Sequence, residues 1–263
     1  MADEEVARQR LRETGEEAVI RRDPLMPGAF ELVIGGSPQS HVDLGDPAAL
    51  FHDYVRRIGA VIDRLRMPGE PITAVHLGAG ALTLPRYVQA TRPDSEQHVV
   101  ELAEELVPFV TDALPLPAGT RLTTHPGDAA RVLNGADLAR AARRADLVIA
   151  DLYQGTTTPA HLRTTGFYRA ASALLAPEGV LVVNVADDDD APALHAHLEA
   201  LDPVLSHLVL SGPSSVVTDA RAGNVVILAS ASPALLDWLP ALRAAGPHPG
   251  VVDTVAALRG AAG

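Results

Sequence analysis

The stretch "ADLVIADLYQGTTTPAHLRTTGFYRAASALLAPEGVLVVNVA" at residues 145–186 is the most informative part of the chain for its architecture. It holds two apolar runs, 145–152 and 179–186, with a helical stretch at 159–175 between them. Strands that are apolar along their length are buried on both faces, as in a parallel sheet covered by helices. The stretch therefore predicts a strand–helix–strand unit of an α/β protein.

The same alternation extends in both directions from this unit. Three further apolar runs are expected strands: 73–78, 97–102 and 121–126. The segments after these runs have helical periodicity: 82–91, 103–113 and 128–143. Beyond residue 186, a helix at 190–201 leads to strands at 204–212 and 224–230 that no helix joins. These two strands predict an antiparallel hairpin at the sheet edge.

The chain is expected to divide into four segments. They are a polar tail or frayed helix (1–22), a β-hairpin with a helix (23–69), the α/β domain (70–232) and a helical tail (233–263). In the second segment, strands at 30–36 and 40–44 form the hairpin. Asp46 and Pro47 then resemble a helix start, and the helix is expected to end near Arg66.

Composition excludes several classes of function. The net charge of −12 argues against a basic nucleic-acid surface, and the absence of cysteine excludes disulfides and thiolate catalysis. The charged N-terminus has no apolar signal sequence, and no apolar run reaches the ~18 residues of a membrane span. The histidines and the "DDDD" run lack metal-ligand spacing. We therefore expect a cytoplasmic protein without metal, nucleic acid or membrane partner.

The first α/β strand is followed by "GAGA", whose Gly78 and Gly80 let the backbone approach a ligand closely. A plain tight turn would also explain these glycines. Glu101, however, ends the next strand, where an acid can bind both hydroxyls of a ribose. Together these residues favour an adenosine-type ligand. Thr83 replaces the third glycine of a dinucleotide fingerprint, which counts against a nicotinamide dehydrogenase.

Acids also follow two other strands. Asp128, next to Ala129, could accept the exocyclic amine of adenine, cap the following helix, or do both. Asp151 comes at the mouth of the expected cleft, where a carboxylate can bind or deprotonate an amine. The alternative for Asp151 is a structural acid that ends a strand. Tyr153 and Gln154 could line the same pocket.

In their order along the chain, these features resemble the spermidine synthase (aminopropyltransferase) family over roughly residues 28–230. The matching segments are "ELVIGGSPQS" (31–40), "HLGAGALTLPRYV" (76–88), "HVVEL" (98–102), "HPGDAARVL" (125–133) and the block from Asp146 to Val185. The resemblance implies a class I S-adenosylmethionine methyltransferase-like fold. That fold is a Rossmann-like, mostly parallel sheet of seven strands with a C-terminal antiparallel hairpin, plus a small N-terminal β segment.

The resemblance also implies a reaction, the transfer of an aminopropyl group from a sulfonium nucleoside to a small-molecule amine. The co-substrate is decarboxylated S-adenosylmethionine or S-adenosylmethionine. By position, its contacts would be Gln39, Gly78, Gly80, Glu101, Asp128 and Ala129. Asp151 would bind and deprotonate the amine, and Tyr153 and Gln154 would line its site. Relatives commonly form dimers or tetramers, so a homodimer or homotetramer is expected.

Two acids of the family pattern are absent from this chain. Ala81 stands where an acid grips the amino end of the decarboxylated co-substrate, and Gln154 replaces a second acid. Each lost charge-assisted hydrogen bond costs about 1.5–3 kcal/mol. The nucleoside half of the site therefore matches the family better than the polyamine half. An S-adenosylmethionine-dependent methyltransferase and a non-catalytic nucleoside-binding protein remain as alternatives.

Overall fold

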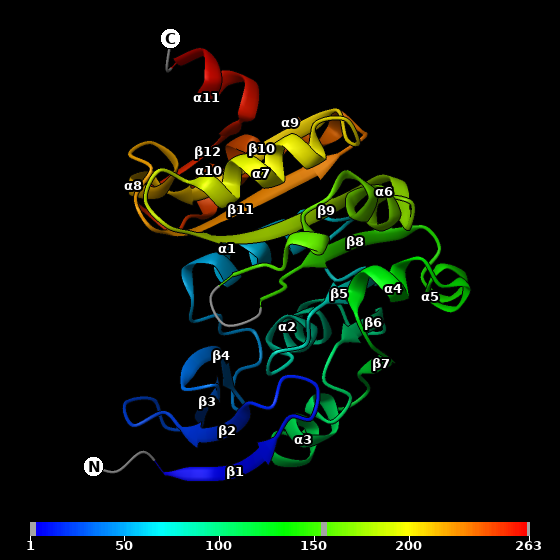
Figure 1. The fold of residues 1–263 in the computed structure, drawn as a ribbon, viewed down its shortest axis with the longest axis vertical. Helices are drawn as coiled ribbons and strands as arrows, with labels where there is room; N and C mark the ends of the chain where they lie inside the picture. The colour runs from blue at the N-terminus through cyan, green and yellow to red at the C-terminus, as the bar shows by residue number, and fades with distance from the viewer. Residues whose placement is uncertain (1–3, 154–156, 262–263) are drawn as a thin grey trace.

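The computed structural model describes residues 4–153 and 157–261, and an eight-stranded sheet lies at its centre (Figure 1). Five strands run parallel to one another: β5 (Thr73–Leu77), β6 (Glu96–Glu101), β7 (Arg121–Pro126), β8 (Ala145–Ala150) and β9 (Leu175–Asp187). The antiparallel part consists of β10 (His207–Pro213), β11 (Gly223–Ser230) and β12 (Gly250–Thr254). The strand order is β12-β10-β11-β9-β8-β5-β6-β7. This is the expected α/β class with one strand more than the seven predicted.

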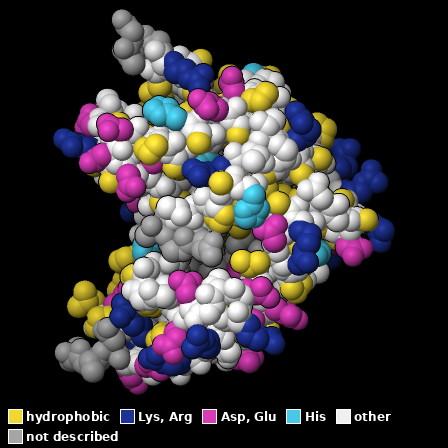
Figure 2. All heavy atoms as spheres, viewed as in Figure 1, with side chains coloured by type: hydrophobic (Ala, Val, Ile, Leu, Met, Phe, Trp, Pro, Cys, Tyr) yellow, Lys and Arg dark blue, Asp and Glu magenta, His cyan; other side chains and the backbone are white. Residues whose placement is uncertain are grey.

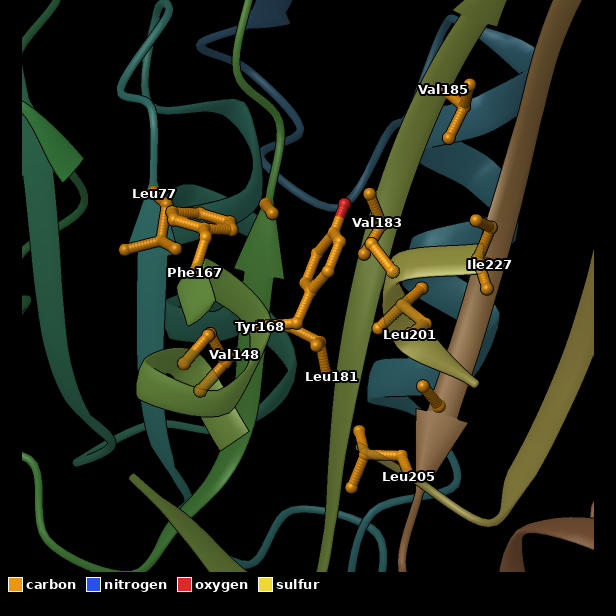
Figure 3. Close-up of a cluster of buried hydrophobic side chains, with 14 of the residues drawn as sticks. Leu77, Val148, Phe167, Tyr168, Leu181, Val183, Val185, Leu201, Leu205 and Ile227 are labelled. Atoms are coloured by element: carbon orange, nitrogen blue, oxygen red, sulfur yellow. The ribbon is translucent and has the colours of Figure 1, made fainter. Parts of the chain in front are cut away.

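Apolar side chains on both faces of the strands bury the sheet between two layers of helices. Every residue of β8 is buried, and Val148 packs on one face while Leu147 and Ile149 pack on the other. The first face is covered by α4 (Ala129–Leu133), α5 (Ala136–Ala141), α6 (Thr165–Ser172) and α7 (Pro192–Leu201). The second is covered by α1 (Asp53–Ile62), α2 (Thr83–Thr91), α9 (Ala234–Asp237) and α10 (Leu239–Ala245). In Figure 3, Phe167 and Tyr168 of α6 lie over the first face.

A separate antiparallel sheet forms the N-terminal part of the chain. Its strands, in spatial order, are β1 (Glu5–Arg10), β2 (Glu17–Arg22), β3 (Ala29–Ile34) and β4 (Ser37–Asp43). The predicted β3–β4 hairpin is confirmed. The predicted tail or frayed helix over residues 1–22 is wrong where the structure describes it. Ala18 and Ile20 lie on one face of β2 and are fully buried, in a cluster that includes α3 (Leu106–Ala113).

The helix expected from Asp46 begins later, at Asp53. The Asp46 carboxylate accepts the N–H of Ala48 (3.1 Å), and its carbonyl oxygen accepts that of Ala49 (2.9 Å), so the Asp–Pro signal forms a turn. The helix α1 then packs on the large sheet, although it precedes that sheet in sequence.

The C-terminal segment, which the sequence predicted to be a helical tail, also contains a strand. Strand β12 pairs antiparallel with β10, while β11 lies between β9 and β10. The β10–β11 pair is antiparallel as expected, but it contains the short helix α8 (Ser214–Val217) and does not form the sheet edge. After β12 the described chain ends in α11 (Val255–Ala261). The segment that forms β12, "GVVDT", has only two apolar residues, which are adjacent, so no alternation reveals a strand.

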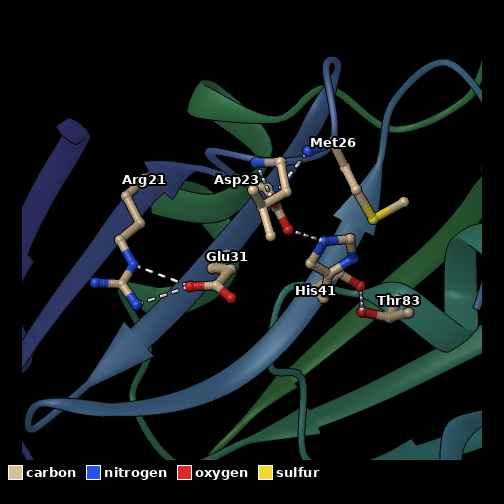
Figure 4. A network of polar contacts seen from close by, with 7 residues as sticks. Arg21, Asp23, Met26, Glu31, His41 and Thr83 are labelled. Atoms are coloured by element: carbon tan, nitrogen blue, oxygen red, sulfur yellow. Dashed lines mark hydrogen bonds and ion pairs between the residues drawn. The ribbon is translucent and has the colours of Figure 1, made fainter. Parts of the chain in front are cut away.

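The two sheets meet at the carboxyl ends of the parallel strands. Thr83, in the first turn of α2, donates its hydroxyl to the carbonyl oxygen of His41 in β4 (3.2 Å). His41 is buried and its Nε2 lies 2.9 Å from the carboxylate of Asp23, as Figure 4 shows. The molecule narrows where the sheets meet, as the space-filling view shows (Figure 2). A site at this edge is therefore built by both sheets.

Candidate functional site

A cavity of about 240 Å³ lies between the two sheets at this edge. It has roughly eight times the ~30 Å³ volume of a water molecule, so it can hold an organic ligand. All the site residues that the sequence predicted and the structure describes line it: Gln39, Gly78, Gly80, Glu101, Asp128, Ala129, Asp151 and Tyr153. Gln154, the remaining predicted residue, lies outside the described residues.

The loop after β5 is held on both sides by very close neighbours. Gly78 has φ +98°, and a Cβ there would lie 2.2 Å from the carbonyl oxygen of Asp151. Gly80 has φ +50°, and a Cβ there would lie 2.4 Å from Oγ of Ser40. Ser40 also accepts the backbone N–H of Ala81 (3.1 Å). The glycines therefore bring this loop against β8 on one side and the N-terminal sheet on the other.

Glu101, at the end of β6, has a carboxylate fixed by backbone donors. Its Oε2 accepts the N–H of Ala79 (2.9 Å), and its Oε1 accepts the N–H of Ala103 (2.9 Å). Burial raises the pKa of the Glu101 carboxyl, against the lowering effect of these backbone hydrogen bonds. Each oxygen retains acceptor capacity toward the cavity, so the group can bind two neighbouring hydroxyls.

Asp128 caps α4 and also makes a contact that the sequence did not reveal. Its Oδ1 accepts the N–H of Arg131 (3.0 Å), and its Oδ2 lies 2.8 Å from Nε2 of His161. Burial opposes ionisation of Asp128, but the hydrogen bonds from His161 and Arg131 outweigh it and lower the pKa of its carboxyl. His161 belongs to the short 3-10 helix η1 (Ala160–Leu162) and lines the cavity. No motif in the sequence marks it.

Asp151, directly after β8, lines the cavity and is held by two hydrogen bonds. The side-chain amide of Asn184 donates to its Oδ1 (2.8 Å), and the Tyr54 hydroxyl hydrogen-bonds the same carboxyl group. Burial raises the pKa of the Asp151 carboxyl, and these two hydrogen bonds only partly offset it. A desolvated carboxylate of this kind binds protons and cations more strongly than one in water.

The chain is similar to known proteins in both sequence and structure. Over 204 residues the chain is 26% identical to a polyamine aminopropyltransferase of Chromobacterium violaceum, covering 76% of this chain and 72% of that protein. Its structure matches that of a probable spermidine synthase from Corynebacterium glutamicum with a TM-score of 0.83 and 25% identity, covering 98% of this chain and 93% of that one. The chain is therefore similar to a polyamine aminopropyltransferase in sequence and to a probable spermidine synthase in structure. No family model matches it.

Two more distant structures match the fold of this chain. One is a spermidine synthase in complex with the transition-state analogue AdoDATO (TM-score 0.61, 15% identity, 87% of this chain and 74% of that one). The other is human methyltransferase-like protein 13 in complex with SAH (TM-score 0.56, 19% identity, 75% and 95%). The fold is therefore the class I methyltransferase fold that the sequence predicted.

The glycine loop after β5 carries alanine, and no acid, at position 81. This residue is fully buried and belongs to the same apolar cluster as Leu82 and the N-terminal sheet. Ala81, which stands where the family pattern has an acid, is therefore packed so that its side chain has no exposure to solvent. A carboxylate introduced there would be buried at considerable cost.

The hydroxyl of Tyr153 is held by two hydrogen bonds to the backbone of β9. Its hydroxyl donates to the carbonyl oxygen of Asn184 (2.9 Å) and accepts the N–H of Ala186 (2.6 Å). Burial raises the pKa of this phenol, with a further contribution from the negative charge of Asp151. The tyrosine therefore contributes a neutral, fixed wall to the site.

Carboxylates dominate the charge of the cavity. Glu16, Glu101, Asp128 and Asp151 line it, and its described lining residues include no Arg or Lys. Within residues 4–153 and 157–261, no group of three or more acids or histidines is placed to hold a metal. No helix in this part of the chain is long and apolar enough to cross a membrane. The cavity thus favours cationic ligands.

Proposed function

We propose that the chain transfers the aminopropyl group of decarboxylated S-adenosylmethionine to a small-molecule amine. The observation that carries this proposal is the charge of the cavity, where Asp151 and three other carboxylates face no Arg or Lys among the described lining residues. A co-substrate with a sulfonium and an ammonium group is complementary in charge to this negatively charged cavity. The similarity to a polyamine aminopropyltransferase, and to folds that bind AdoDATO and SAH, supports a related co-substrate.

In this proposal the nucleoside binds across the ends of β5, β6 and β7. Glu101 accepts the ribose hydroxyls, because its carboxylate is fixed by two backbone N–H groups and lines the cavity. Asp128 and Ala129 face the adenine. Gly78 and Gly80 allow the backbone to approach the sulfur-bearing part. Gln39 reaches the nucleoside from the N-terminal sheet.

The chemical step is a substitution at the carbon bonded to sulfur. The sulfonium is already a good leaving group, so the chain must align the amine and keep its nitrogen lone pair free. Asp151 accepts a proton from the acceptor ammonium, and the amine nitrogen then forms the new C–N bond. The C–S bond breaks with its electron pair on sulfur, which leaves methylthioadenosine. A raised carboxyl pKa brings Asp151 nearer to the amine in proton affinity.

Tyr54 and Asn184 position Asp151 for this step, because both hydrogen-bond its carboxyl group. Tyr153 and Gln154 are proposed to line the amine site. We further propose that the protein acts in the cytoplasm as a homodimer or homotetramer, the states expected from the family resemblance.

Decarboxylated S-adenosylmethionine is expected to bind at least about tenfold more tightly than S-adenosylmethionine, because the extra carboxylate would enter an anionic cavity. Calorimetry with each compound at equal ionic strength measures this ratio, and methylthioadenosine is the control without a charged tail. Tighter binding of S-adenosylmethionine would favour a methyltransferase instead. Binding of all three without transfer to any amine would favour a non-catalytic nucleoside-binding protein.

Replacing Glu101 with Gln is expected to weaken methylthioadenosine binding about tenfold or more, since a hydrogen bond to a charged group contributes ~1.5–3 kcal/mol. Glu96→Gln is the matched control, because Glu96 is exposed at the opposite end of the same strand. Titration calorimetry gives both affinities, and thermal denaturation separates lost binding from lost folding. Equal affinities for the two variants would remove Glu101 from the proposed nucleoside site.

A further inference from the structure

A second hollow, of about 380 Å³, adjoins the cavity on the side of Asp151. The two share Gln39, His52, Tyr54 and Tyr153 as lining residues. Asn184, whose amide holds the Asp151 carboxylate at 2.8 Å, also lines this hollow. An amine that delivers its nitrogen to Asp151 therefore extends its other end into this space.

We propose that the acceptor is a primary amine whose far end carries a neutral hydrogen-bonding group, such as a hydroxyl or an amide, and not a second ammonium. This inference rests on the proposed transfer to an amine at Asp151. It names the class of acceptor, which the charge of the first cavity does not determine.

Among the described residues that line the hollow, no carboxylate is free to bind a second ammonium. Asp53 is the one acid among its described lining residues, and Arg57 binds both of its oxygens (2.6 and 3.2 Å). Arg57 is itself buried and donates to the carbonyl oxygen of Pro247 (3.1 Å) and to Ser211 (3.4 Å). The guanidinium is thus fixed in place, and it neutralises Asp53.

The hollow instead offers neutral hydrogen-bonding groups. Asn224 donates its amide to Oδ1 of Asn184 (3.1 Å), so the two amides form a chain that ends at Asp151. Among the described residues no donor bonds the amide oxygen of Asn224, which is left to accept a hydrogen bond from a ligand. Ser37 supplies a hydroxyl. Burial and repulsion from His41 lower the pKa of the His52 imidazole, against the attraction of Glu31, which favours its neutral form.

The physical consequence is discrimination between acceptors of the same length. An ammonium brought into this hollow loses hydration and gains no unpaired anion, whereas a hydroxyl finds both donors and acceptors. The carboxylate of Asp151 cannot serve both ends of the acceptor, since it takes the reacting nitrogen.

Calorimetry with methylthioadenosine bound tests the inference, using 4-amino-1-butanol and 1,4-diaminobutane as length-matched acceptors. The amino alcohol is expected to bind at least about tenfold more tightly. Equal or tighter binding of the diamine overturns the inference and leaves the proposed transfer intact. Binding of neither amine overturns both. Binding of methylthioadenosine alone is measured first. If methylthioadenosine does not bind, the proposed function is overturned, because its nucleoside site is absent.

A designed carboxylate gives an independent check. Ser37 lines the hollow next to the β3–β4 turn, so Ser37→Asp places a carboxylate there with little effect on packing. Ser37→Asn is the matched neutral control. We expect Ser37→Asp to shift the ratio of affinities toward 1,4-diaminobutane at least about fivefold and Ser37→Asn to leave the ratio unchanged. An equal response of the two variants counts against a charge-selective hollow.

Discussion

Replacing Asp151 with Asn is expected to lower aminopropyl transfer by a factor of about 10²–10⁴, the usual contribution of a positioned proton acceptor. The amide has the shape of the carboxylate and can still meet Asn184 and Tyr54, so methylthioadenosine binding should change by less than about threefold. Transfer is measured as methylthioadenosine release with saturating amine. The control is Asp46→Asn, which alters an exposed acid in a turn and should leave the rate unchanged.

The same substitution is expected to stabilise the fold at neutral pH. Burial raises the folded-state pKa of Asp151 above its unfolded value, so stability is lost as pH rises through the folded-state pKa. At pH 8 the ionised carboxylate is therefore unfavourable in the folded chain. Asp151→Asn should raise the free energy of unfolding there by up to about 1 kcal/mol.

Denaturant unfolding at pH 8 and pH 5 tests whether Asp151→Asn raises the free energy of unfolding. The difference between the Asn variant and the wild type should shrink at the lower pH, where Asp151 is more protonated. Unchanged transfer, or a variant less stable than wild type at pH 8, would contradict a catalytic, desolvated carboxylate at this position.

The site residues that the sequence predicted are those that the topology of the parallel sheet brings together. Gly78, Glu101, Asp128 and Asp151 each follow a parallel strand. Because these strands end at one edge of the sheet, strand boundaries alone were enough to bring the four residues together. The roles of these residues remain proposals, since lining one cavity does not assign them.

The residues that sequence reasoning missed come from elements whose placement depends on tertiary packing. Tyr54 is in a helix that precedes the sheet, and His161 is in a loop helix. Neither has a spacing that relates it to Asp151 or Asp128. Asn184 had a signal that could have been used, because it is a lone amide inside an otherwise apolar, buried strand.

The N-terminal strands were missed for a related reason. Strand β1 is an edge strand with four polar or charged residues in six, so it lacks an apolar face of its own. It is held by its pairing with β2 and by Arg8, whose guanidinium binds Glu17 across the strands (2.6 Å). Such pairing depends on register, which composition does not reveal.

Replacing Gly78 with Ala is expected to have the largest effect on the fold of any single change in the loop. The new Cβ would lie 2.2 Å from the carbonyl oxygen of Asp151, and backbone rather than a side chain would have to move. The φ of +98° adds strain for any residue with a Cβ. A loss of about 3 kcal/mol or more in the free energy of unfolding should result, measured by urea denaturation.

Gly80→Ala is the matched comparison, because it changes the same loop by the same methyl group. Its φ of +50° lies in the left-handed region, which costs an L-residue roughly 1–2 kcal/mol. The atom that its Cβ would meet at 2.4 Å is Oγ of Ser40, which can rotate away. Adding Ser40→Ala should therefore recover part of the loss for Gly80→Ala and none for Gly78→Ala. If Gly78→Ala and Gly80→Ala lost the same free energy of unfolding and responded equally to Ser40→Ala, the close approach of β5 to β8 would not determine the conformation of this loop.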